Sequence, residues 1–220
     1  ATGTGELTTA GGSQPKARVT HAAAWPDGIG RVEAAANYGT YGGSSFERPN
    51  IIPQRTDTIL VTSTEHDSAG NMLSQDNPAG RSTRFEYDGA GRRTKQIMNF
   101  VPASSSSSTS VTDCSASDDT NVSVETAYNA DGNVSSITAV NSATGNQTTQ
   151  YIYGTTLTDS DVAMSSLKRA EIYPDSDDTA ALGDGTDETY DRIEFKYNRQ
   201  GQPTEIKDQQ GTLHTMEYDG

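Results

Sequence analysis

The chain has 220 residues, a formal net charge of −14 at pH 7 and a hydrophobic content of only 31%. The acidic balance argues against nucleic acid as a partner, because no basic stripe is present to neutralise phosphates. No stretch approaches the apolar length of a transmembrane helix, so no membrane insertion is expected in this segment. Low hydrophobicity with high net charge is typical of disordered chains, but ten tyrosines and a sequence repeat favour ordered structure.

The repeat is a turn of the form Asp/Asn-x-x-Gly, which recurs where the sequence is uninterrupted. Its first side chain can accept hydrogen bonds from nearby backbone N–H groups, and its Gly supplies the positive φ of a tight hairpin. Short strands separated by such turns predict antiparallel β-structure, and their repetition predicts an array. The seven turns run from Asp27 to Gly30, Asp67 to Gly70, Asn77 to Gly80, Asp88 to Gly91, Asn129 to Gly132, Asn198 to Gly201 and Asp208 to Gly211.

The chain divides into regions with and without this repeat. Residues 1–60 carry one turn and a Gly-rich loop, and we expect irregular β-structure there. Residues 61–98, 121–153 and 190–220 show the repeat, the last of them cut short at its end. In the third repeat region, Ile193, Phe195 and Tyr197 alternate with charged residues, which predicts a half-buried strand.

Two insertions interrupt the repeat. Residues 99–120 contain a Ser-rich run, which is typical of a flexible loop that buries little surface. Residues 154–189 include Asp159-Ser160-Asp161, which resembles a helix start, with basic residues following at Lys168 and Arg169. A short helix is therefore expected in the second insertion, ahead of an acidic loop.

A tyrosine stands before several of these turns, and the combined motif resembles the YD repeat of the Rhs family, which also includes the animal teneurins. The resemblance implies a strip of β-hairpins that coils into a hollow shell. In bacterial members such a shell often encloses a toxic C-terminal domain, and other members are large secreted or surface proteins. The motif residues are Tyr87, Asp88, Gly91, Tyr128, Asn129, Gly132, Tyr197, Asn198, Gly201, Asp208, Gly211, Tyr218 and Asp219.

The fold class predicted from these observations is all-β, an antiparallel array of hairpins forming part of a coiled sheet or shell. Isolated hairpins are marginally stable in water, so neighbouring strands must bury what one hairpin leaves exposed. The expected partners are therefore flanking repeats of the same protein or identical copies. Since the sequence stops inside a turn at Tyr218-Asp219-Gly220, we expect a segment of a larger protein. The resemblance to the Rhs family implies that this protein is extracellular or at the cell surface.

Candidate chemistry is sparse. The sequence holds no recognisable catalytic motif, its three histidines are isolated, and its single cysteine, Cys114, is expected to be an exposed free thiol, with an interchain link as the alternative. One acidic loop could supply oxygen ligands to Ca²⁺, although its spacing does not match an EF-hand and a solvated loop is the favoured interpretation. Its carboxylates are Asp175, Asp177, Asp178, Asp184, Asp187 and Glu188. No other cofactor is expected.

The predicted function is a structural, non-enzymatic segment of a large extracellular Rhs/YD-repeat protein. Two alternatives stay open at this point. The segment could be a repeating unit of an extracellular filament joined through strand edges, since strand addition needs only unpaired backbone groups. It could instead be an adhesin whose aromatic stripe at Thr149, Tyr151 and Tyr153 contacts cell-surface glycans, although such a stripe in a repeat is more typical of a core face.

Overall fold

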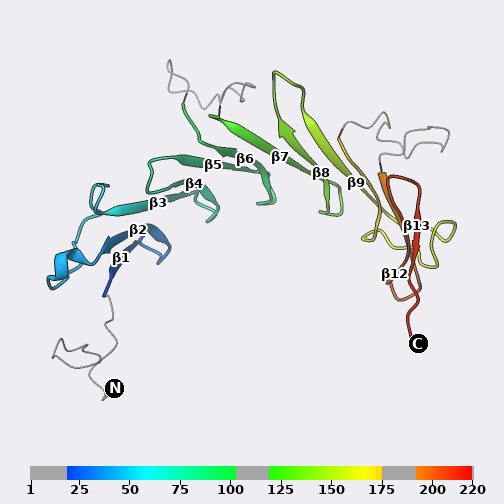
Figure 1. Ribbon diagram of the computed structural model, residues 1–220, viewed down its shortest axis with the longest axis horizontal. Helices are drawn as coiled ribbons and strands as arrows, with labels where there is room; N and C mark the ends of the chain where they lie inside the picture. Colours follow the sequence, from blue (N-terminus) through cyan, green and yellow to red (C-terminus); the bar gives the residue numbers. More distant parts are fainter. Residues whose placement is uncertain (1–18, 103–118, 175–191, 220) are drawn as a thin grey trace. The chain divides into compact units, whose positions relative to one another are not determined.

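The computed structural model describes residues 19–102, 119–174 and 192–219 (Figure 1). This described part is nearly all β, with thirteen strands and one 3-10 turn at Tyr41–Gly43. The prediction of an all-β array of antiparallel hairpins is confirmed. The chain forms two compact units, residues 1–82 and 83–220, and each is described by itself.

Unit 1 contains four strands that pair with their neighbours in chain order, all antiparallel. They are β1 (His21–Pro26), β2 (Val32–Gly39), β3 (Leu60–His66) and β4 (Met72–Asp76). Burial alternates along β2, so Ala34, Ala36 and Tyr38 share a face with Trp25 of β1. The small alanines leave room for the rings, and Phe46 from the β2–β3 connection packs against this cluster. Within residues 1–60, where irregular β-structure was expected, residues 21–39 form an antiparallel hairpin that has its own core and register shifts at both ends of its pairing.

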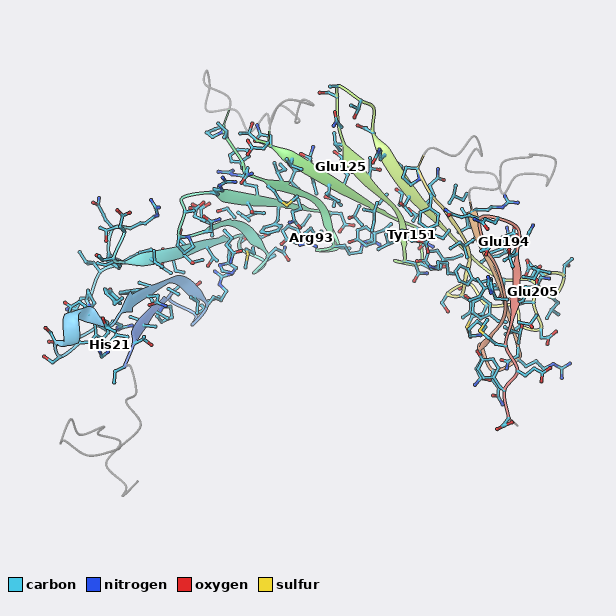
Figure 2. All side chains as sticks on the ribbon, in the orientation of Figure 1. His21, Arg93, Glu125, Tyr151, Glu194 and Glu205 are labelled. Atoms are coloured by element: carbon cyan, nitrogen blue, oxygen red, sulfur yellow. The ribbon has the colours of Figure 1, made fainter. Side chains whose placement is uncertain are left out.

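Unit 2 contains the other nine strands, ordered in the sheet as they are in the chain. They are β5 (Ser82–Tyr87), β6 (Arg93–Met98), β7 (Val122–Tyr128), β8 (Val134–Val140), β9 (Gln147–Tyr153), β10 (Lys168–Ile172), β11 (Arg192–Tyr197), β12 (Pro203–Lys207) and β13 (Leu213–Thr215). Within this unit the side chains stand on both faces of a single layer (Figure 2). Among its described hydrophobic residues only Ile97, Ala170 and Ile172 are buried. The described part of unit 2 therefore has no continuous buried core.

The prediction of a short helix after Asp159 is wrong. Residues 157–160 form a turn and bend, and the basic residues that were read as a helix end belong to strand β10. This strand pairs with β9 on one side and β11 on the other, and it buries Ala170 and Ile172. Ladder hydrogen bonds and burial in the sheet outweigh the weak local helix preference of these residues.

Candidate functional site: the repeated turns

All seven predicted turns share one backbone geometry. The N–H of the first residue donates to the carbonyl of the residue four positions on, and the Gly N–H donates to the carbonyl of the first residue. These N···O distances lie between 2.7 and 3.1 Å. The Gly φ angles lie between 76° and 94°, a region that other residues rarely adopt. The repeated Gly is thus explained by backbone conformation.

The Asp or Asn side chain completes each turn from inside. Asp27 Oδ1 accepts hydrogen bonds from the N–H groups of Ile29 at 3.0 Å and Arg31 at 2.9 Å. The same double acceptance recurs at Asn77, Asp88, Asn198 and Asp208. These bonds satisfy backbone donors that the hairpin ladder leaves over, which is why Asp and Asn favour this position.

The second oxygen of each turn aspartate binds a side chain. Asp27 Oδ2 accepts from Arg31 Nε at 2.7 Å, and Asp67 Oδ2 accepts from Asn71 Nδ2 at 2.9 Å. Asp88 has the same contact with Arg92 Nε at 2.7 Å. The residue that closes the turn, four positions after its start, is therefore a part of the motif that the sequence reading missed. The signal was present, since this position holds Arg, Asn or Gln in most of the turns.

These donors stabilise the ionised carboxylates. The hydrogen bond from the Arg31 side chain lowers the pKa of Asp27 from 3.8 to about 2. The Asn71 side chain lowers the pKa of Asp67, and the backbone N–H and guanidinium of Arg92 lower that of Asp88. Hydrogen-bonded carboxylates with lowered pKa values are poor proton acceptors near neutral pH. The arrangement is therefore better suited to stabilising the turns than to acid–base catalysis.

The last turn has a different partner. Asp208 is closed by Thr212, and its Oδ2 lies 3.1 Å from Nε2 of His214, a residue on β13. The His214 side chain is the main cause of the lowered pKa of Asp208. This contact is exposed, with 59% of the histidine side chain accessible, so its energetic contribution is screened by solvent.

Three of the motif tyrosines connect their hairpin to the strand before it. Tyr128 ends β7, and its hydroxyl donates to the carbonyl of Arg93, the first residue of β6, at 2.9 Å. Tyr197 at the end of β11 bonds the carbonyl of Lys168, the first residue of β10, at 2.7 Å. Tyr218 bonds the carbonyl of Pro203, the first residue of β12, at 2.7 Å. The tyrosine therefore acts as a cross-strand tie.

A register shift accompanies the residue before the turn. The ladder slips between Glu86 and Tyr87, between Ala127 and Tyr128, and between Lys196 and Tyr197. Unit 1 has the same shift before the turns at Asp27 and Asp67. An irregularity of this kind re-aims a side chain, so it helps to direct Tyr128 and Tyr197 towards the neighbouring strand.

Successive turns within a unit also touch. In unit 1, Arg31 Nη1 donates to the carbonyl of Asp67 at 3.3 Å. In unit 2, the guanidinium of Arg92 lies over the Tyr128 ring, 4.5 Å from its centroid. A Cβ placed on Gly132 would lie 3.7 Å from Arg92 Nη1. Each of these arginines thus binds its own turn and reaches the next one on the same edge of its unit.

The connection after β9 also contacts a neighbouring repeat, at the end of β11. Asp161 N–H donates to the carbonyl of Tyr197 at 2.9 Å, and Tyr197 N–H donates to Ser160 Oγ at 3.2 Å. Thr155, which is buried, closes this connection by donating from Oγ1 to the carbonyl of Val162 at 2.6 Å. The second insertion therefore begins as an ordered spacer between two repeats.

The other predicted site residues are placed as follows. All six carboxylates of the candidate Ca²⁺ loop, and Cys114, lie outside the described residues. Within the described ranges, no group of three or more His, Cys, Asp or Glu side chains could hold a metal ion. Tyr151 and Tyr153 are half-buried, and the Lys168 ammonium lies over the rings of Tyr151 and Phe195 at 5.4 and 4.9 Å. This part of the aromatic stripe packs against the protein's own cation.

Two surface grooves are lined by paired charges, whereas a third is lined mainly by alanines of β1 and β2 together with Leu60 and Pro78. One of about 290 Å³ is lined by Glu86, Lys95 and Glu125, among others, and Lys95 Nζ lies 3.0 Å from Glu125 Oε1. Glu125 lies on β7, away from the repeated turns (Figure 2). In the part of the chain described, no helix has the length and apolar character to cross a membrane.

Comparison with known proteins gives matches of two kinds. Residues 66–98 match the family model RHS Repeat. Among solved structures, the complex titled TcdB2-TccC3-TEV aligns with a TM-score of 0.37 and 14% identity, and TcdB2-TccC3 without its hypervariable C-terminal region aligns with 0.36 and 15%. Each alignment covers 82% of the present chain but only 9% of the matched chain. The present chain therefore spans less than a tenth of the length of either matched chain. No curated protein matches the sequence.

The family match coincides with the structural repeat. It begins at His66, ends at Met98 and encloses β4, β5 and β6 with the turns at Asp67, Asn77 and Asp88. The Tyr87-Asp88 motif, on which the resemblance to the Rhs family was based, lies inside it. The chain is therefore a structural repeat segment that carries an RHS repeat at residues 66–98.

Proposed function

We propose that this chain is a non-catalytic structural segment of the β-sheet shell of a larger extracellular or cell-surface Rhs/YD-repeat protein. The observation that carries the proposal is the use of the motif side chains. Turn carboxylates bind their own backbone, motif tyrosines bind the preceding strand, and arginines bind the next turn. The conspicuous residues of the repeat are thus engaged in holding hairpins side by side.

The burial pattern supports flanking repeats as the partners. Unit 2 leaves several large hydrophobic side chains exposed, including Ile137 at 38%, Leu157 at 76% and Leu213 at 55%. A single sheet layer buries little apolar surface, and hairpins of a repeat array gain stability from their neighbours. In a larger protein, an adjoining hairpin that pairs with β13 would extend the sheet and cover Leu213.

The decisive experiment is electron microscopy of the native full-length protein that contains this segment, at neutral pH. Discrete hollow particles are the expected result, since the hairpins would then line a closed wall. Long regular fibres would overturn the proposal and assign the segment to a filament. Glycan binding by the purified segment that is lost in both Tyr151→Ala and Tyr153→Ala would instead identify an adhesin.

A further inference from the structure

Every second connection of unit 2 lies at the same edge of its sheet. The strands pair with their neighbours in chain order and run antiparallel, so the chain returns to this edge after β5, β7, β9 and β11. We call it the turn edge, and its connections are residues 88–92, 129–133, 154–167 and 198–202. Contacts between neighbouring connections along this edge join one hairpin to the next.

The first two of these connections are tied together. The Tyr128 hydroxyl donates to the Arg93 carbonyl at 2.9 Å, and the Arg92 guanidinium lies 4.5 Å from the centroid of the Tyr128 ring. Arg92 is the last residue of its turn, and its Nη1 would lie 3.7 Å from a Cβ placed on Gly132 of the next turn. The hairpins β5–β6 and β7–β8 are therefore joined at the turn edge by side chains as well as by their ladder.

The last two connections are tied in the same way. The Tyr197 hydroxyl donates to the Lys168 carbonyl at 2.7 Å, and the Asp161 N–H donates to the Tyr197 carbonyl at 2.9 Å. Leu167 is the last residue of its connection, and its Cδ2 would lie 4.0 Å from a Cβ placed on Gly201 of the next turn. The contact between β9–β10 and β11–β12 thus repeats the first one with a different side chain.

Unit 1 contains a third example. Arg31 is the last residue of the β1–β2 turn, and its Nη1 would lie 3.7 Å from a Cβ placed on Gly70 of the β3–β4 turn. The hairpins are therefore joined two by two at their turns, as β1–β4 in unit 1 and as β5–β8 and β9–β12 in unit 2.

The junction between the two hairpin pairs of unit 2 has neither kind of tie. Tyr153 ends β9 and Val134 begins β8, which are the donor and acceptor positions of the tyrosine ties. Among the described residues, no hydrogen bond joins this hydroxyl to this carbonyl, and none joins residues 129–133 to residues 154–167. The position of Arg92 is taken in the 129–133 turn by Asn133, whose side chain is shorter.

The β8–β9 ladder does not replace the missing ties. It pairs residues 136–139 with residues 147–150, and the short connection at 141–146 joins the strands at the edge opposite to the turn edge (Figure 1). The β6–β7 ladder likewise stops short of the turn edge, at Lys95 and Glu125. There the tyrosine tie bridges the remaining gap, whereas the corresponding ends of β8 and β9 are unbridged.

We propose that the β8–β9 junction is a seam, at which the sheet of unit 2 opens from the turn edge while the hairpin pairs β5–β8 and β9–β12 stay folded. Each pair keeps its own ties during this opening, and residues 141–146 keep the two pairs connected. Local opening of this kind begins where the fewest interactions must be broken. The seam is a property of the folded segment and does not depend on the function proposed above.

The first test is native-state amide hydrogen exchange of the 220-residue chain, followed by NMR. Amides that are hydrogen-bonded across β8–β9 should exchange about tenfold faster than those across β6–β7 and β10–β11. This factor corresponds to the loss of one or two hydrogen-bond-sized contacts. Equal protection of the three junctions would overturn the proposal.

Matched tyrosine variants test the cause. Tyr197→Phe removes a tie and should speed exchange across β10–β11 by about two- to tenfold. Tyr153→Phe removes a hydroxyl that makes no such bond and should leave exchange across β8–β9 unchanged. If Tyr197→Phe does not fold, Tyr128→Phe provides the same comparison at β6–β7. An equal acceleration in the two tyrosine variants, each at its own junction, would show that Tyr153 is also a tie and would refute the seam.

A cross-link tests the location of the opening. Ile137 and Thr149 face each other across β8–β9, so Ile137→Cys with Thr149→Cys, in a Cys114→Ser background, allows a disulfide between directly opposed residues. The oxidised form should slow exchange across β8–β9 to the level of the neighbouring junctions.

The matched cross-link is Gln96→Cys with Val124→Cys across β6–β7 in the same background, and it should slow exchange there by a smaller factor. Equal slowing by the two disulfides, each at its own junction, would mean that unit 2 opens without a preferred place and would contradict the seam.

Discussion

The β1–β2 hairpin of unit 1 and the β7–β8 hairpin of unit 2 share the same turn but differ in what stabilises them. The first buries Trp25 and Tyr38, each 6% exposed, beneath its own connection to β3. The second has half-buried apolar residues, and it is tied to β6 by the Tyr128 hydroxyl and to the turn before β6 by Arg92. The turn therefore fixes where the chain reverses, whereas the core depends on what is connected to the hairpin.

The difference has a geometric cause. The connection between β2 and β3 covers residues 40–59, long enough for Phe46 to return to the hairpin face. The connection that follows the second hairpin, between β8 and β9, covers only residues 141–146 and is too short to fold back over its strands. Polar ties between strands replace burial where no covering segment is available.

The largest effect is expected from Trp25→Ala. Removal of a buried aromatic side chain costs about 3–5 kcal/mol, because apolar burial is lost and a cavity remains. Hydrogen exchange should show the loss in β1, β2 and β3. The matched variant is Phe195→Ala in unit 2, where the half-buried ring should cost about 1–2 kcal/mol. Equal losses in the two units would contradict the claim that unit 1 alone has a continuous aromatic core.

The next effect is expected from Gly132→Ala in the β7–β8 turn. Alanine at the observed φ of 87° costs about 1–2 kcal/mol, and its methyl group would meet Arg92 at 3.7 Å. Gly89→Ala is the control, since Gly89 is a turn glycine outside the left-handed region with open space around it. Urea unfolding of the two variants should differ; indistinguishable midpoints would refute a conformational role for the fourth position of the turn.

A smaller effect is expected from Tyr128→Phe. The variant keeps the ring under Arg92 but loses the hydrogen bond to Arg93, which is worth about 0.5–1.5 kcal/mol. Exchange should accelerate where β6 meets β7. Tyr41→Phe serves as the comparison in unit 1, because the described contacts of Tyr41 are ring contacts that phenylalanine retains. If both variants behave alike, the hydroxyl is not a cross-strand tie.

The smallest effect is a pH dependence that separates Asp turns from Asn turns. Lowered folded-state pKa values mean that Asp27, Asp67 and Asp88 stabilise the fold above their ordinary pKa of 3.8. This contribution is lost as the pH falls through the folded value, about 2 for Asp27. The turns at Asn129 and Asn198 have no such carboxylate.

Hydrogen exchange between pH 4 and pH 2, corrected for intrinsic rates, should therefore show selective loosening around the Asp turns. In Asp27→Asn the pH-dependent part of the loosening should disappear from the β1–β2 hairpin and persist at Asp88. A uniform response of Asp and Asn turns would show that the turn carboxylates do not control the acid behaviour.

The seven turns could be predicted because their determinants are local. Asp or Asn accepts bonds from backbone groups within four residues, and Gly is needed wherever φ is positive, so the sequence window contains the complete interaction. Strand β10 could not be predicted in this way, because its pairing partners in β9 and β11 outweigh the helix-like charges of its neighbourhood. The closing Arg31 and Arg92 were overlooked although their spacing from the turn aspartate is constant.

The repeat, the positions at which the chain reverses and the all-β class follow from the amino-acid order, since each depends on contacts within a few residues. The carbonyl that each tyrosine binds, the turn that each arginine reaches and the segment that covers Trp25 depend instead on how distant parts of the chain come together. The hydrogen bond from the Arg48 side chain to the Ala24 carbonyl illustrates the physical reason. It joins residues 24 positions apart, and nothing in the residue types alone selects that acceptor over the other exposed carbonyls of the sheet.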